Sequence, residues 1–108
     1  PERVALFEKD RYVIISPHTL ADLDYESEQL HHCVRIYGNM VSSGYTKVYF
    51  LREKAEMEKP YGTIEIRKGK LMQLKGKYNS KVNVKAQEFV LKWANMMGIT
   101  INSDDIAV

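Results

Sequence analysis

The residues most able to carry out chemistry are His31, His32 and Cys33, which follow one another in the chain. A cysteine becomes a nucleophile when a base or a helix N-terminus lowers the pKa of its thiol, and a histidine can be that base. On a helix, however, His32 and Cys33 point about 100° apart and cannot bind one metal ion side by side. Cys33 also lies on an apolar stripe, where a cysteine usually packs as a small hydrophobic residue. We therefore expect Cys33 to be structural, and the sequence predicts no metal site and no cofactor.

A second group of polar residues, Glu65, Gln73 and Lys75, is spaced as on two neighbouring strands. Many metal-dependent nucleases place an acid on one strand and an acid-x-Lys on the next, so that magnesium lies beside a lysine that activates water. Here Gln73 stands at the position of the second acid, which leaves little negative charge for a divalent ion. The alternative is a cross-strand polar pair that only stabilises the sheet.

Basic residues are concentrated between Arg67 and Lys81, although the net charge of the chain is only +2. This stretch holds six basic residues and no acidic one. Such a strip attracts phosphate groups, and Tyr61 and Tyr78 could stack on unpaired bases. The alternative is a solvated hairpin edge, where lysines discourage aggregation of the sheet. The residues expected to contact nucleic acid are Arg67, Lys68, Lys70, Lys75, Lys77, Tyr78 and Lys81.

Length and composition predict one compact domain over residues 1–108. The single cysteine excludes an intramolecular disulfide framework. No apolar run reaches the ~18 residues that a membrane span needs, and no signal-peptide pattern opens the chain. We therefore expect a cytoplasmic protein without a membrane partner. Because the chain begins at Pro1 without an initiator methionine, we also expect it to be part of a longer protein.

The hydrophobic pattern predicts two main helices. The first runs from about Ser27, a suitable N-cap, to Ser43, after a short helical turn that reaches Leu23. The second covers about residues 84–97, with Asn83 as its N-cap and glycine after its last turn. The buried stripe of this second helix is expected to consist of Ala86, Phe89, Val90, Trp93 and Met97.

Alternating and β-branched residues predict strands at residues 12–15, 47–52, 61–67, 71–77 and 99–101. The third and fourth form a hairpin, and a three-residue loop at 68–70 keeps its two faces distinct. That register places Glu65 opposite Gln73, Thr63 opposite Lys75, and Ile64 opposite Leu74. The sequence thus predicts a single α+β domain, with an antiparallel sheet of three to five strands packed by two main helices. The tail from residue 102 to residue 108 is expected to be loose.

Several spaced residues together resemble the PcfJ-like family. They are Glu26-x-x-x-Leu30-x-His32-Cys33-Val34-x-x-Tyr37, Gly44, Leu51-Arg52, Thr63-x-Glu65, Gln73-x-x-Gly76-x-x-Asn79, Phe89 and Trp93. The His-Cys-Val tripeptide is the hallmark of that family, and the resemblance covers roughly residues 12–97. Ser27 stands where many relatives have glycine. The resemblance implies a bacterial domain within a longer protein of conjugative plasmids or phages, and it implies no established activity.

The resemblance also selects polar residues that packing alone explains poorly. Together with Lys75, they form the expected polar pocket of His32, Tyr37, Arg52, Thr63, Glu65, Gln73, Lys75 and Asn79. In this pocket Arg52 and Lys75 would supply positive potential for a phosphate or a carboxylate.

Three functions remain open from the sequence. The first is a domain of a mobile-element protein that binds DNA or RNA through the basic hairpin. The second is an enzyme that acts on nucleic acid or a nucleotide at His32, Glu65, Gln73 and Lys75. The third is a protein-interaction module in which the polar residues only fix the fold. An open cleft favours the enzyme, whereas full burial with mutual hydrogen bonds favours the module.

Overall fold

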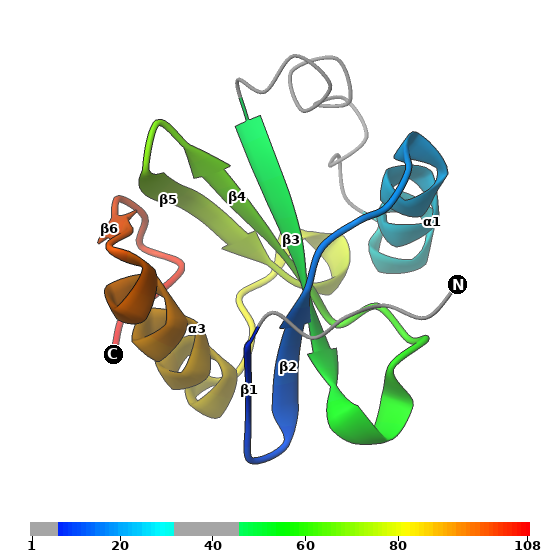
Figure 1. Ribbon diagram of the computed structural model, residues 1–108. Coiled ribbons are helices and arrows are strands. Elements are labelled where there is room, and N and C mark those ends of the chain that lie inside the picture. The colour runs from blue at the N-terminus through cyan, green and yellow to red at the C-terminus, as the bar shows by residue number, and fades with distance from the viewer. Residues whose placement is uncertain (1–6, 32–45) are drawn as a thin grey trace.

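The computed structural model of the chain describes residues 7–31 and 46–108, which form three layers (Figure 1). A six-stranded sheet lies in the middle, with helix α1 (Leu20–Leu30) on one face and helix α3 (Val84–Met97) on the other. The strands are β1 (Phe7–Lys9), β2 (Tyr12–Ile15), β3 (Thr46–Glu53), β4 (Gly62–Arg67), β5 (Lys70–Lys75) and β6 (Thr100–Ile101). The expected α+β architecture is confirmed, and the expected residues 32–43 of the first helix lie outside the described residues, as do His32, Cys33 and Tyr37.

The strands lie in the sheet in their order along the chain, from β1 to β6. All neighbours are antiparallel except β5 and β6, which are parallel. The prediction of a purely antiparallel sheet of three to five strands is therefore wrong in strand number and in the direction of β6. Strand β1 gives no clear alternation of apolar and polar residues in the sequence, because it has only three residues and two of them are exposed. Strand β6 is parallel because α3 carries the chain back along the sheet before β6 begins.

The β4–β5 hairpin has the predicted register but a different turn. Glu65 lies opposite Gln73, and Thr63 lies opposite Lys75, as expected. The loop is shorter than predicted, because Arg67 already pairs with Lys70 and a bulge shifts the register between Glu65 and Ile66. Lys68 and Gly69 at the turn have φ of 52° and 77°, the positive values that a tight hairpin turn requires. The bulge absorbs the extra residue and keeps the polar face continuous.

Helix α3 agrees closely with its prediction and packs the larger apolar cluster against the sheet. The Asn83 side chain accepts a hydrogen bond from the Ala86 amide at 2.8 Å, and Gly98 ends the helix with φ of 73°. Trp93, 1% exposed, lies in this cluster with residues of β2 to β5. Met97 is an exception, because it is 55% exposed and does not belong to the buried stripe as predicted.

Helix α1 differs from its prediction at both described ends. It begins after Thr19, whose hydroxyl accepts from the Asp22 amide while Asp22 accepts from the Thr19 amide. This reciprocal capping box fixes the start, so the prediction that Ser27 caps the helix is wrong. The helix ends at Leu30, because His31 adopts the left-handed conformation with φ of 55°. Leu23 packs α1 against the second apolar cluster, on the face of the sheet opposite to α3.

The C-terminal tail is packed, so the prediction of a loose tail is wrong. Asp105 is 4% exposed and accepts hydrogen bonds from the Leu74 amide at 3.0 Å and from Lys75 at 2.8 Å. Ile106 is buried in the larger apolar cluster, and the Ala107 amide donates to Gln87 on α3. Burial opposes ionisation of Asp105, but the hydrogen bonds from Lys75 and Leu74 outweigh it and lower the pKa of Asp105. The tail therefore contacts both β5, through Asp105, and α3, through Ala107, and links the two elements.

Candidate functional site

Arg52 and Thr63, two of the residues expected in the polar pocket, lie in a buried network with Glu26. Arg52 donates two hydrogen bonds to the Glu26 carboxylate, at 3.0 and 2.6 Å, and the Thr63 hydroxyl donates a third at 3.1 Å. The side chains of Arg52 and Glu26 are 2% and 0% exposed. Arg52 also donates to the Met57 carbonyl and lies over the Phe50 ring. This is the full burial with mutual hydrogen bonds that favours a structural role, because it fixes α1 to β3 and β4.

The sequence analysis included Glu26 in the family pattern but not in the expected pocket. Its spacing from Leu23 and Leu30 puts it on the buried face of α1. A buried acid on a helix needs a cationic partner, and Arg52 on the adjoining strand β3 provides it. An acid within the apolar stripe of a helix is therefore the signal that could have identified this network.

Glu65 lies on the same face of the sheet, farther along β4. It is 3% exposed, and one of its carboxylate oxygens accepts from Arg67. The other oxygen, Oε1, is buried and has no hydrogen-bond partner in the described part of the chain, and the same holds for the Thr46 hydroxyl on β3. Gln73 lies directly opposite Glu65 on β5. A buried carboxylate oxygen without a donor is costly, which makes Glu65 the strongest chemical candidate among the expected pocket residues.

The remaining described members of the expected pocket point elsewhere. Lys75 forms its ion pair with Asp105 in the tail, at 2.8 Å. Asn79 is exposed and has φ of 59° in the 3-10 segment η3 (Lys77–Asn79). Among the described residues, the structure therefore brings together Arg52 with Thr63, and Glu65 with Gln73, whereas Lys75 is paired with the tail and Asn79 is exposed.

The basic strip separates into two groups at opposite ends of the β4–β5 hairpin. Lys68 and Lys70 lie at the turn, beside Arg67, whose guanidinium is paired with Glu65. Lys77, Tyr78 and Lys81 follow the last residue of β5 at the other end. Lys75 lies between the two groups and is paired with Asp105. A strand of nucleic acid would therefore meet two separate basic patches and not one continuous hairpin surface.

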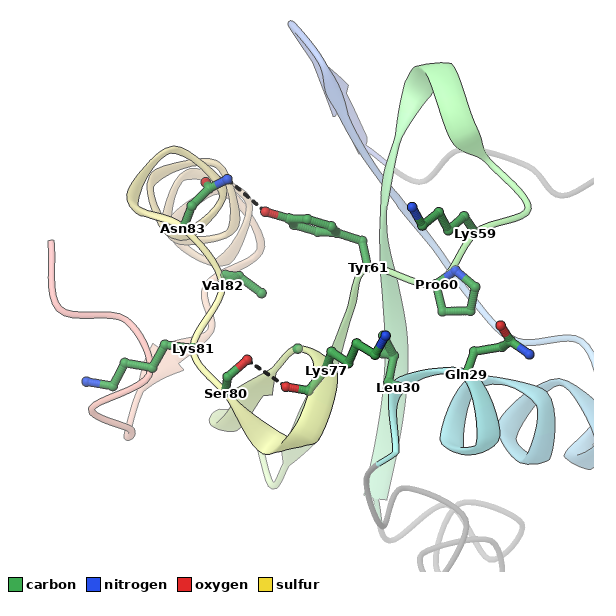
Figure 2. Close-up of a pocket in the computed structure, with 11 residues that line it drawn as sticks. Gln29, Leu30, Lys59, Pro60, Tyr61, Lys77, Ser80, Lys81, Val82 and Asn83 are labelled. Atoms are coloured by element: carbon green, nitrogen blue, oxygen red, sulfur yellow. Dashed lines mark hydrogen bonds between the residues drawn. The ribbon is translucent and has the colours of Figure 1, made fainter.

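A pocket of about 360 Å³ lies at the second of these patches, and we call it the lysine pocket (Figure 2). Its lining residues are Gln29, Leu30, Lys59, Pro60, Tyr61, Gly76, Lys77, Ser80, Lys81, Val82 and Asn83. Lys77 extends toward Leu30 and Lys59 extends above Pro60 toward the side of Tyr61, whereas Lys81 extends away from both at the rim (Figure 2). Lys59 has an exposed ion pair with Glu56 at 3.6 Å, which holds it only weakly. Within residues 7–31 and 46–108, three lysines and no acidic residue line the pocket, so the described lining has a positive potential.

Hydrogen bonds between Tyr12, Tyr61 and Asn83 build one wall of the lysine pocket. Asn83 donates to the Tyr61 hydroxyl at 2.8 Å, and its carbonyl oxygen accepts from the Tyr12 hydroxyl at 3.1 Å. Burial raises the pKa of Tyr61, and the neighbouring Tyr12 raises it further, so the phenol stays neutral. Because Asn83 also caps α3, the wall is rigidly attached to the helix.

Next to the pocket, the aromatic rings of His31 and Tyr78 stack with centroids 4.7 Å apart and planes 5° from parallel. Both residues have positive φ, 55° and 56°, so the backbone is shaped to bring the rings together. Tyr78 is 67% exposed, and the Lys77 ammonium lies 5.6 Å from its ring centroid. The structure thus connects the end of α1 to the 3-10 segment η3 beside the lysine pocket.

Lys59 is a pocket residue that the sequence does not identify, because it lies in the charged segment between β3 and β4. Lys59 and Lys77 line the same pocket only because the fold brings the end of the segment between β3 and β4 beside η3. Pairing of strands far apart in sequence does not show in local residue patterns, so no local signal identifies Lys59.

Comparison with known proteins identifies the family. The sequence profile of the PcfJ-like protein family matches residues 2–90. The chain belongs to the PcfJ-like family. An uncharacterised protein of Listeria innocua is 35% identical to this PcfJ-like domain over 97 residues, which cover 86% of the chain. The match spans 21% of the Listeria protein, so the chain corresponds to about a fifth of that relative's length. No solved structure matches the chain.

Two further properties of the PcfJ-like domain concern the described residues alone. None of the helices within residues 7–31 and 46–108 is long and apolar enough to cross a membrane. Over the same residues, no group of three or more histidine, cysteine, aspartate or glutamate side chains is placed to hold a metal ion.

Proposed function

We propose that this PcfJ-like domain binds single-stranded nucleic acid through the lysine pocket. The observation that supports this most strongly is that Lys59 and Lys77, from two chain segments, line one pocket with Lys81 at its rim, and that no acidic residue of the described ranges 7–31 and 46–108 lines it. Each lysine that neutralises a backbone phosphate releases condensed counterions, and this release favours binding whatever the base sequence.

The shape of the pocket supports a single strand over a duplex. Its volume of about 360 Å³ can receive a phosphate or part of a nucleotide. Only unpaired nucleotides can turn their bases and phosphates into a concave site of this kind, because bases in a duplex stay stacked inside the helix. Gln29 adds an amide group to the lining that can bond to base edges or phosphates, whereas Ser80 and Asn83 already donate to Lys77 and Tyr61.

The same proposal places the domain within a larger bacterial protein of a plasmid or phage. The resemblance to the PcfJ-like family supports this setting, and the short share of the Listeria relative that matches is consistent with a domain of a longer protein. DNA and RNA share the phosphate chemistry on which the proposal depends, so the first experiment uses both.

The proposal is tested by titrating a labelled single-stranded oligonucleotide, as DNA and as RNA, at low salt and following its fluorescence anisotropy. We expect Lys59→Gln with Lys77→Gln to weaken binding at least tenfold. The matched control is Lys68→Asn with Lys70→Gln, which removes two charges at the hairpin turn and keeps a residue that tolerates positive φ at position 68. Equal loss in the two double variants would assign binding to the hairpin as first predicted, and no binding at low salt would favour a protein-interaction module.

A second function, an enzyme acting on nucleic acid, is favoured by one observation. The buried Oε1 of Glu65 lacks a hydrogen-bond partner among the described residues, and an oxygen left without a donor can orient a water molecule or a substrate group. We expect this function, if present, to appear as cleavage of a labelled single strand that Glu65→Gln abolishes. Cleavage that is absent, or that survives the substitution, would leave Glu65 with a structural role.

A further inference from the structure

A second pocket lies between the β1–β2 turn and one face of α3. Its volume is about 560 Å³, within the range of ~300–1,000 Å³ that is usual for small-ligand sites. Lys9 and Arg11 line it from the turn, and Lys85 and Lys92 line it from the helix. We call it the Lys9–Lys92 pocket. None of its basic residues belongs to the basic strip or to the lysine pocket.

Aromatic packing fixes the two sides of this pocket relative to each other. The Phe89 ring on α3 lies 5.2 Å from the Phe7 ring on β1 and 5.5 Å from the Tyr12 ring on β2, measured between centroids. Phe89 and Tyr12 are 7% and 3% exposed, so these contacts belong to the core. The core therefore holds the β1–β2 turn against α3 and sets where Lys9 and Lys92 attach.

The charges in the pocket are not balanced. Arg11 is paired with Glu53 at 2.5 Å, and this hydrogen bond raises the pKa of Arg11. Lys85 is paired with Glu88, a lining residue one helical turn away, at 3.8 Å. Within residues 7–31 and 46–108, neither Lys9 nor Lys92 has a carboxylate at ion-pair distance.

Lys9 and Lys92 line the same pocket from its two sides, the β1–β2 turn and α3. Contact with Lys9 and its positive charge lower the pKa of Lys92, and the attraction of Asp10, the other acid that lines the pocket, does not compensate. Two ammonium groups that line one pocket without a carboxylate partner repel each other, and an anion bound between them removes that repulsion. An anion of high charge density fits this arrangement best, since each ammonium group can donate a charge-assisted hydrogen bond to it.

We propose that Lys9 and Lys92 form a binding site for a phosphate group. The phosphate oxygens accept from both ammonium groups, while Asp10 and Glu88 repel the rest of an anionic ligand and so orient it. The phosphate can belong to a nucleic-acid strand or to a small phosphorylated molecule. Tyr12, which lines this site, is hydrogen-bonded to Asn83, which lines the lysine pocket, so the two pockets are neighbours.

The experiment uses inorganic phosphate as the probe and follows the lysine side-chain signals of the whole chain by NMR. We expect phosphate to raise the pKa of Lys92 relative to chloride at equal ionic strength, because a bound anion removes the repulsion between the ammonium groups. Lys9→Gln should raise the pKa of Lys92 in chloride and remove its response to phosphate. Lys47→Gln, an exposed lysine at the far end of β3, is the matched control and should change neither result. An equal pKa of Lys92 in phosphate and chloride would overturn the proposal.

A second arm identifies the source of the phosphate. A single-stranded oligonucleotide that raises the pKa of Lys92 in the original chain, but not in Lys59→Gln with Lys77→Gln, would show one strand crossing both pockets. An oligonucleotide without effect on Lys92, together with a response to inorganic phosphate, would assign the site to a small phosphorylated ligand. The response of Lys92 to inorganic phosphate does not depend on the lysine pocket. This site can therefore be confirmed when the proposed function fails, and the proposed function can be confirmed when this site fails.

Discussion

Arg52 on β3 and Glu26 on α1 form an ion pair through two hydrogen bonds, at a position where both side chains are almost completely shielded from solvent. Thr63 on β4 donates to the same carboxylate. One acid thus joins a helix and two strands. This explains why these polar residues of the family pattern lie inside the domain.

Removing one partner of this ion pair is expected to destabilise the folded domain strongly. Glu26→Ala or Arg52→Ala should each lower the free energy of unfolding by about 3–5 kcal/mol, because the remaining charge stays buried without its counter-charge. The double variant should lose less than the sum of the two losses. Urea denaturation of the three variants measures these values, and single losses below about 1 kcal/mol would show that the pair is open to solvent.

Asp105 is expected to make the tail sensitive to acid. Because the pKa of Asp105 is lower in the folded chain than its ordinary 3.8, its contribution to stability is complete above that value and is lost as the pH falls through the folded pKa. Asp105→Ala should lower the free energy of unfolding at neutral pH by about 1.5–3 kcal/mol and remove this part of the acid dependence.

The control for Asp105 is its exposed neighbour, Asp104→Ala. Unfolding by urea at several pH values between 2 and 7 is the measurement. An Asp105→Ala variant that keeps the acid dependence of the original chain would contradict the role of the tail as a fastening of β5.

Asn83 has two separable roles, as the cap of α3 and as part of the wall of the lysine pocket. Asn83→Ala should cost about 1–2 kcal/mol of stability through loss of the cap. Asn83→Asp keeps a capping oxygen and should preserve most of the stability, but it places a negative charge in the pocket and should weaken oligonucleotide binding. Thermal unfolding and anisotropy distinguish the two effects. A stable Asn83→Asp variant with unchanged binding would place the strand elsewhere.

Tyr78 is expected to contribute more to the binding of single strands than to the binding of duplexes. Its exposed ring already stacks on His31, and an unpaired base can extend this stack, whereas a paired base cannot. Tyr78→Asn, which tolerates the positive φ at this position, should weaken single-strand binding by about 1–3 kcal/mol and leave duplex binding nearly unchanged. Competition between the two forms of one oligonucleotide measures the difference. Equal loss for both forms would indicate that Tyr78 only shapes the backbone.

The sequence predicts those parts of the fold whose signals are local. The register of Glu65 with Gln73 follows from alternation along two adjacent strands, and α3 follows from its cap and apolar stripe. The strong apolar spacing beyond Ser27 predicts a helix that starts there. The capping box that sets the true start of α1 involves only Thr19 and Asp22 and gives a weaker signal. The burial of Asp105 depends on contacts with β5, about thirty residues earlier in the chain, and no local pattern reveals it.

In the candidate site, too, the sequence predicts the features with local signals but not those that depend on distant parts of the chain. The sequence identified Lys77 and Lys81 as basic residues that could contact phosphates, and the structure places both at one pocket. It could not show that Arg67 and Lys75 are paired with Glu65 and Asp105, because charge counts along the chain do not include partners brought by folding.

The central claim, that phosphates bind in the lysine pocket, is tested most directly by the salt dependence of single-strand binding. Each phosphate contact on a single strand contributes about −0.7 to the slope of log affinity against log salt concentration. Removing Lys59 and Lys77 should therefore make the slope shallower by about 1.4, which is roughly sevenfold less weakening for a fourfold rise in salt. The Lys68→Asn with Lys70→Gln control should keep the original slope. A slope that is unchanged without Lys59 and Lys77, or that becomes shallower only in the control, would contradict the account.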